Sequence, residues 1–215
     1  MKVRRQSFRD SELADGHASV WAKVEENEIT LVPSPVALTE SVSPYLAKSS
    51  GHGSVQKISV RMLHNGTTFG IRIAWLDPDK DDVVNDLDQF PDGLAVMFPL
   101  RPGASAITMG SVDKPVNAWL WKADEREPFD VFARGYATSE RRQSTDSDLK
   151  VASYHEDGRW TVVFQRRLDA LGESYYSIIP GAPSAVAFAV WEGSNNERSA
   201  QKSVSGEFMP FSVDT

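Results

Sequence analysis

The sequence predicts an all-β protein, an antiparallel β-sandwich with long loops and a few short helices. Short runs of alternating apolar and polar residues, separated by turn residues, support this fold class. In residues 56–76 the alternation continues on both sides of Asn65-Gly66, a pair that favours the positive φ of a hairpin turn. Residues 149–168 repeat the pattern around Asp157-Gly158. Each of these segments is therefore expected to form a β-hairpin.

The remaining strands are expected in shorter apolar runs, at residues 29–32, 94–98, 116–123, 129–136, 185–191 and 208–213. Short helical turns are expected near residues 43–50 and 166–172. Neither a Pro/Ser-rich linker nor an internal repeat divides the chain. We therefore expect residues 1–215 to form one domain, with residues 1–20 as an extended N-terminal arm.

Bulk composition excludes several classes of protein. Of the 215 residues 40% are hydrophobic and 25% charged, as in soluble globular proteins. The net charge of −7 argues against nucleic acid as a partner, because nucleic-acid binding needs a basic face. No apolar stretch approaches the roughly 20 residues of a membrane span. The basic N-terminus is not followed by an apolar segment, so we expect no cleavable signal peptide.

The chain has no cysteine. This excludes disulfides, thiolate zinc sites, cysteine-ligated iron–sulfur clusters and covalent attachment of a c-type haem. A metal or cofactor would have to be held by His, Met, Lys, Tyr or carboxylate side chains. The four histidines show no H-x-x-x-H or H-E-x-x-H pair, so a zinc enzyme is not favoured. His52 lies between two glycines, where the backbone could approach a ligand closely.

Four loops are longer than a hairpin needs and are expected to carry any binding site. They comprise residues 76–93, 99–115, 139–148 and 193–206. Asp77, Asp79 and Asp81 alternate in the first of them, as in a calcium loop. However, Asp82 stands where such a loop needs glycine, so an acidic turn is favoured over a calcium site.

Several side chains have both a structural and a binding interpretation. Trp119 and Trp121 share one side of a predicted strand, where they could belong to the core or line a cavity for a flat cofactor or a sugar. Met109 precedes a glycine in a loop, which taken alone indicates a packing methionine. Lys202 lies in a polar loop, which taken alone indicates a surface charge.

Several motifs together resemble the haem-binding γ subunits of ethylbenzene dehydrogenase-type enzymes, which are molybdenum enzymes of the dimethyl sulfoxide reductase family. The motifs include "SPYLAKSSGHG", "FPDGLAVMFP", "TMGSVDKPVNAWLWKA" and "AFAVWEGSNNERSAQKSVSGEF". They run in matching order from about residue 20 to the C-terminus, and the last two are the most specific. Relatives include steroid C25 dehydrogenase, dimethyl sulfide dehydrogenase, selenate reductase and chlorate reductase.

The resemblance implies a β-sandwich that holds one non-covalent haem b through a methionine and a lysine. By motif, the lysine is Lys202 and the methionine is Met109. Met97 is the rival, although a residue within a strand is less free to reach iron than one in a loop beside glycine. His52 is expected near the haem. An amine binds iron only after losing its proton, so Lys202 would have to be shielded enough to be neutral.

The resemblance also implies partners and a location. They are a catalytic α subunit with molybdenum cofactor and an iron–sulfur cluster, an iron–sulfur β subunit, and an external electron acceptor such as cytochrome c. With both axial positions of iron filled, this subunit would transfer electrons and would not itself catalyse the oxidation. A periplasmic location would then require co-export with a partner that bears a signal peptide.

Two alternatives belong to other classes. A carbohydrate- or ligand-binding β-sandwich module could use Trp119 and Trp121 as a sugar platform. A hydrolase would need a nucleophile elbow or a pair of catalytic carboxylates, and the sequence offers neither.

Overall fold

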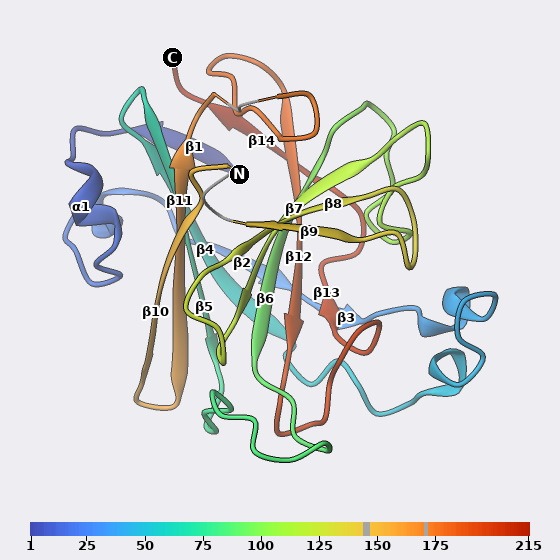
Figure 1. The fold of residues 1–215 in the computed structure, drawn as a ribbon. Helices are drawn as coiled ribbons and strands as arrows, with labels where there is room; N and C mark the ends of the chain where they lie inside the picture. Colours follow the sequence, from blue (N-terminus) through green and yellow to red (C-terminus); the bar gives the residue numbers. More distant parts are fainter. Residues whose placement is uncertain (144–146, 170–171) are drawn as a thin grey trace.

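Two layers of strands face one another (Figure 1). The computed structural model describes residues 1–143, 147–169 and 172–215, whose strands join in one 14-stranded sheet that supplies both layers. The first layer contains, in order, β10 (Lys150–Glu156), β11 (Arg159–Arg167), β5 (Thr68–Leu76) and β4 (Lys57–His64), with β2 (Asn27–Thr30) also paired to β4. The second contains β12 (Ser184–Trp191), β6 (Gly93–Pro99), β7 (Val116–Lys122), β8 (Phe129–Ala133) and β9 (Glu140–Gln143). The predicted all-β fold class is confirmed.

Short strands at the ends of the chain join the layers. β1 (Lys2–Arg5) lies between β4 and β14 (Met209–Val213) and is parallel to both, and β14 continues to β12. Residues 1–20, expected as an extended arm, thus supply a sheet strand, and Leu13 after it is fully buried. β13 (Ser203–Val204) pairs with β12 and with β3 (Val32–Pro33).

Both predicted hairpins are present. β4 and β5 pair around Asn65-Gly66, where Gly66 has φ 98° and Asn65 Oδ1 accepts the amide hydrogens of Thr67 and Thr68. β10 and β11 pair around Asp157-Gly158, with φ 51° and 66°. At Asp157-Gly158 both central residues of the turn have positive φ, which suits the right-handed twist of the flanking strands.

The core between the layers is rich in aromatic side chains. Trp75 and Trp160 from the first layer meet Trp121 from the second, with ring centroids 6.2 Å and 4.8 Å from that of Trp121. Trp119 packs against Phe98 at 4.8 Å. Such offset and edge-on aromatic contacts add to the free energy of burial. Trp119 and Trp121 are 0% and 2% exposed, so they belong to the core, which was the more ordinary of their two interpretations.

Helical segments are short. They are α1 (Asp10–Leu13), η1 (Trp21–Lys23), η2 (Val36–Thr39) and η3 (Leu46–Lys48). The expected turn near residues 43–50 corresponds to η3. The one expected within residues 166–172 begins inside β11, and residues 170–171 lie outside the described part of the chain. None of the helices in the described ranges has the length and apolar character needed to cross a membrane.

The core position of Trp119 gives a stability prediction. Trp119→Ala should lower the free energy of unfolding by about 3–5 kcal/mol, because it leaves a cavity against Phe98 and Phe69. Leu87→Ala, at a side chain 97% exposed, should change it by less than about 0.5 kcal/mol. Urea unfolding followed by circular dichroism measures both. A Trp119→Ala protein as stable as the wild type would contradict this packing.

Candidate functional site

The outer face of the second layer is a sheet surface of small apolar side chains. Strand side chains alternate between faces, so Leu94, Val96 and Phe98 of β6 enter the core while Ala95 and Met97 face outward. Across β6, Ala95 is opposite Ala189 of β12, and Met97 is opposite Ala118 of β7. Short side chains side by side make a flat, shallow floor. Strands apolar on both faces are typical of a sheet covered on both sides.

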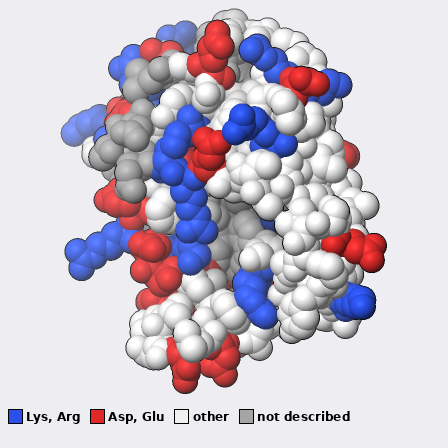
Figure 2. All heavy atoms as spheres, turned by 45° about the vertical axis from the view of Figure 1, so that its right-hand side comes forward, with Lys and Arg blue, Asp and Glu red and all other residues white. Residues whose placement is uncertain are grey.

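Loops rise around this floor and enclose a cavity of about 420 Å³. The walls come from residues 34–46, 106–109, 136–141 and 199–206, which include parts of three of the four long loops. Figure 2 shows this side of the molecule hollowed, with Lys and Arg side chains along one margin of the hollow. The lining is mostly apolar, as in most cofactor sites. The lining side chains that could contact a ligand through sulfur, nitrogen, oxygen or an aromatic ring include Met97, Met109, Tyr136, Arg141, Trp191 and Lys202.

Backbone hydrogen bonds hold Lys202 at the cavity. Its carbonyl oxygen accepts from the amide of Ser34 at 2.9 Å, and the Ser34 hydroxyl donates to the carbonyl of Ala200. Ser203, the next residue, is fully buried and pairs with Val190 of β12 and Pro33 of β3. The polar loop is therefore attached to a strand edge just where Lys202 occurs.

The ammonium group of Lys202 has unusual surroundings. Its Nζ lies 4.7 Å from the centre of the Trp191 ring, and the Trp191 indole donates to the carbonyl of Ser199 at 3.0 Å. No ion pair joins Lys202 to an acidic side chain within the described ranges. Burial lowers the pKa of Lys202 from 10.5 to about 8. Lys202 is half-buried and has no carboxylate partner in the described ranges, so its amine loses its proton more readily than that of an exposed lysine.

Met109 occupies a left-handed backbone conformation. Its φ is 57°, which is uncommon for a bulky side chain and is maintained only by surrounding structure. Gly110 follows with φ 78°, and a Cβ there would lie 2.7 Å from the carbonyl oxygen of Lys114. The Met109 carbonyl accepts from the amide of Gly135, and the Tyr136 hydroxyl donates to the carbonyl of Ile107. These contacts hold the half-buried Met109 side chain at the cavity.

The two methionines reach the same cavity by different routes. Met97 lies within β6 and is 8% exposed, packed among Ala118, Val131 and Ala187. Met109 belongs to a loop and packs against the edge of that cluster. The position of Met97 is fixed by the strands that pair with β6 on both sides, whereas the position of Met109 is set by the backbone conformation of its turn. The strained turn at Met109 makes it the better candidate ligand.

Three other predicted site residues lie away from the cavity lining. Trp119 and Trp121 project to the core face of β7, which corrects the suggestion that they wall a cofactor site or a sugar platform. His52 does not line the cavity. Its Nε2 lies 2.9 Å from the carbonyl oxygen of Ser34, so it supports the segment to which Lys202 is hydrogen-bonded.

Sequence reasoning missed the cavity floor, Trp191, Tyr136 and Arg141. The alternation of alanine with larger residues in 185–191 is visible in the sequence, but both sets are apolar and it does not say which side is covered. Arg141 is exposed and lies over Phe129 at 5.1 Å. It is the arginine at the cavity and could pair with an anionic group of a ligand.

The environment of Lys202 predicts a pH dependence. In the ligand-free protein, the unfolded chain keeps the ordinary pKa of 10.5 while the folded state has about 8. The unfolded state therefore binds more protons between these values, and this contribution to stability rises with pH across that window. Lys202→Met should be more stable than wild type below pH 8, and the difference should shrink as pH increases.

Urea titrations across the same pH range measure this difference. Lys57→Met is the matched control, because the Lys57 side chain is 61% exposed. It should follow the wild type within about 0.5 kcal/mol. A Lys202→Met advantage that stays constant with pH would show that the Lys202 amine is not shielded.

Comparison with known proteins assigns the family. The family model for ethylbenzene dehydrogenase matches residues 18–147 and 143–203. A Haloferax mediterranei protein named as a respiratory nitrate reductase heme subunit is 34% identical over 187 residues, which are 86% of this chain and 65% of that protein. The chain thus spans less than two thirds of that relative's length.

Two further relatives are γ subunits. Chlorate reductase subunit gamma of Ideonella dechloratans is 30% identical over 207 residues, which are 96% of this chain and 82% of that subunit. Dimethylsulfide dehydrogenase subunit gamma of Rhodovulum sulfidophilum is 29% identical over 196 residues, covering 86% and 70% of the two chains.

Solved structures share the fold at low identity. A family 9 carbohydrate-binding module from Caldicellulosiruptor kristjanssonii, in complex with glucose, has a TM-score of 0.54 at 11% identity over 100% of this chain and 95% of that one. A Bacteroides uniformis protein assigned to carbohydrate binding has a TM-score of 0.58 at 9% identity over 100% and 98%. Identities this low show the fold alone. The family match over most of the sequence shows that the chain belongs to the ethylbenzene dehydrogenase family, with the γ subunits of chlorate reductase and dimethylsulfide dehydrogenase among its relatives.

Proposed function

We propose that the whole chain forms one haem b-binding unit and acts as the electron-transfer subunit of a molybdenum oxidoreductase complex. The observation that carries this proposal is that one apolar cavity is lined both by Lys202, whose pKa burial lowers, and by Met109 on a strained turn. The relatives named as γ or heme subunits of reductases and dehydrogenases support it.

The cavity suits a haem in three respects. Its volume of about 420 Å³ falls within the roughly 300–1,000 Å³ typical of cofactor sites. The small apolar side chains of β6, β7 and β12 would leave room for the apolar body of a porphyrin. Arg141 would pair with a propionate, and Lys202 and Met109 would bind iron. When bound, the haem supplies one-electron transfer.

The protein side chains would control the properties of that site. Shielding keeps the Lys202 amine neutral often enough to act as a ligand, since an ammonium group has no free electron pair. Trp191 and the loop walls exclude water from the amine. The Met109 thioether is a soft ligand that raises the reduction potential. Because two side chains fill the axial positions, we propose that the subunit relays electrons and does not carry out the substrate reaction.

The relatives' subunit names also suggest a place in a larger complex. We propose that the chain associates with a catalytic α subunit carrying molybdenum cofactor and an iron–sulfur cluster, and with an iron–sulfur β subunit. Electrons would pass between the β-subunit clusters and an external acceptor such as cytochrome c. We further propose that the complex works in the periplasm and that the chain is co-exported with a signal-bearing partner.

Absorption spectra test the proposed ligands. Protein expressed with sufficient haem should bind one haem per chain and show a low-spin Soret spectrum. Lys202→Ala and Met109→Ala should each lose low-spin character, because each removes one axial bond. Lys57→Ala is the matched control and should keep the wild-type spectrum, and Met97→Ala tests the rival ligand and should stay low-spin.

Two results would contradict the proposal in different ways. A protein without a Soret band would reject haem binding, and low-spin spectra in both ligand variants would reject the assignment of Lys202 and Met109. Loss of low spin in Met97→Ala alone would move the ligand to Met97. Tryptophan quenching by oligosaccharides without haem binding would favour the carbohydrate-binding alternative, with Trp191 as the tryptophan at the cavity.

A further inference from the structure

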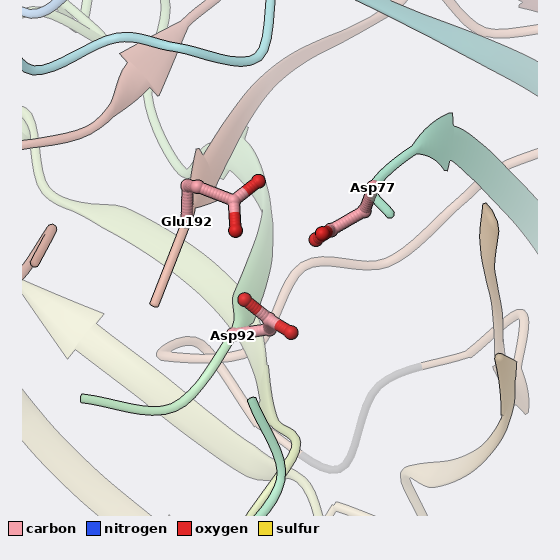
Figure 3. A group of neighbouring side chains, drawn as sticks. All are labelled: Asp77, Asp92 and Glu192. Atoms are coloured by element: carbon pink, nitrogen blue, oxygen red, sulfur yellow. The ribbon is translucent and has the colours of Figure 1, made fainter. Parts of the chain in front are cut away.

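Three carboxylates meet at the other end of the second layer, away from the cavity residues. Asp77 directly follows β5, Asp92 precedes β6, and Glu192 directly follows β12. Their ligating oxygens lie within 4.8 Å of one another, and Figure 3 shows the carboxylates directed toward a common space. The side chains are 0%, 0% and 7% exposed.

The cluster is only partly supplied with hydrogen-bond donors. Asp92 is fully engaged, because its oxygens accept from the amides of Asp81 and Gly193 and from the Trp160 indole, each at 2.9 Å. Glu192 accepts from the Ser194 hydroxyl at 3.0 Å. By contrast, Oδ2 of Asp77 accepts a long hydrogen bond of 3.4 Å from the Trp75 indole, and Oδ1 has no hydrogen-bond partner although the residue is completely buried. A buried carboxylate oxygen without a donor is stabilised by a hydrogen-bond donor, a shared proton or a cation.

Positive side chains do not supply that partner. Within the described ranges, no lysine or arginine forms an ion pair with Asp77, Asp92 or Glu192. Burial, followed by repulsion from the neighbouring carboxylates, raises the pKa of Asp77 to about 7 and that of Glu192 to about 8. Either shared protons or a bound cation can relieve this repulsion.

We propose that Asp77, Asp92 and Glu192 form a binding site for a hard divalent cation, with Ca²⁺ as the ion of matching chemistry. Three carboxylates are the oxygen donors that such ions prefer, and Ca²⁺ tolerates irregular geometry completed by water. Burial raises the pKa of Asp92 and its three donors act against that rise, so its carboxylate would gain from a neighbouring positive charge. Protons could neutralise the cluster. A proton shared by two carboxylates would not contact the third, whereas one cation could contact oxygens of all three.

The surroundings provide an entry path and a structural role. A groove of about 940 Å³ reaches Glu192 and Ser194 and is also lined by Glu26, Glu28 and Asp79. Asp77 belongs to the first layer, whereas Asp92 and Glu192 belong to the second. A cation here would join the two layers opposite the edge where β1 and β14 connect them. Its partners are distant in sequence, so this site differs from the alternating-aspartate loop pattern of residues 77–82.

Terbium luminescence tests the site directly. Tb³⁺ is a probe for Ca²⁺ sites, and Trp160, hydrogen-bonded to Asp92, should sensitise its emission. Titration of the full chain should give saturable emission that Ca²⁺ displaces. Asp77→Asn and Glu192→Gln keep the side-chain shapes and should each weaken Tb³⁺ and Ca²⁺ binding by at least about tenfold. Asp88→Asn, at an exposed position of the same loop, should bind like the wild type.

Thermal unfolding provides a second measurement, on the wild type and on Asp77→Asn. Ca²⁺ at about a hundred times its Kd should raise the unfolding midpoint by roughly 5–10 °C over the chelator-treated protein at matched ionic strength. Asp77→Asn should lose this rise without being less stable than the cation-free wild type, because the substitution relieves repulsion. Samples should have equal haem content, judged from the Soret band, so that the result does not depend on the proposed function.

Two results would overturn the proposal. One is a wild-type midpoint that Ca²⁺ leaves unchanged at matched ionic strength, which would mean that the cluster holds only protons. The other is equal Tb³⁺ emission from wild type, Asp77→Asn and Glu192→Gln, which would place the probe elsewhere.

Discussion

The two-residue alternation of side chains along β6, β7 and β12 is the constraint on which the structure depends. The same strands present large side chains such as Phe98 and Trp119 to the core and small ones such as Ala95 and Ala187 to the opposite face. A shift of one residue in register would exchange the two sets and lose both core and floor together. Packing of the aromatic core therefore also fixes the position and flatness of the cavity floor.

The cavity walls depend on a different kind of interaction. Met109 and Lys202 both lie in loops, yet each is held by backbone hydrogen bonds, the first through Gly135 and the second through Ser34. Backbone contacts place a side chain without using its own polar atoms. The thioether and the amine therefore remain available to a ligand, on a scaffold rigid enough to hold them in place.

The sequence predicted most of the fold because strand alternation and turn residues are local properties. It missed β1, β9 and β13. β1 is largely polar and pairs with strands distant in the chain, β9 is polar throughout although it pairs with the neighbouring β8, and β13 is only two residues long. Lys202 and Met109 were predicted as ligands through motif resemblance, since neither stands out by composition, and both line the cavity. Met97, also predicted, lines the same cavity, whereas Trp119 and Trp121 were suggested for the wrong face. The meeting of Asp77, Asp92 and Glu192 could not be predicted, because tertiary structure brings together residues up to 115 positions apart (192 − 77).

The position of β1 between β4 and β14 has a consequence for biosynthesis. Its partners β4 and β14 are far apart in the chain, and the Met1 amino group donates to the carbonyl of Pro210 across 209 residues. Contacts of such long range form late, because the intervening loop must close first. On the ribosome, the layers cannot be joined at this edge until the last strand has emerged. The loop with Lys202 lies just before β14, so the cavity is completed only after both the loop and β14 have been made.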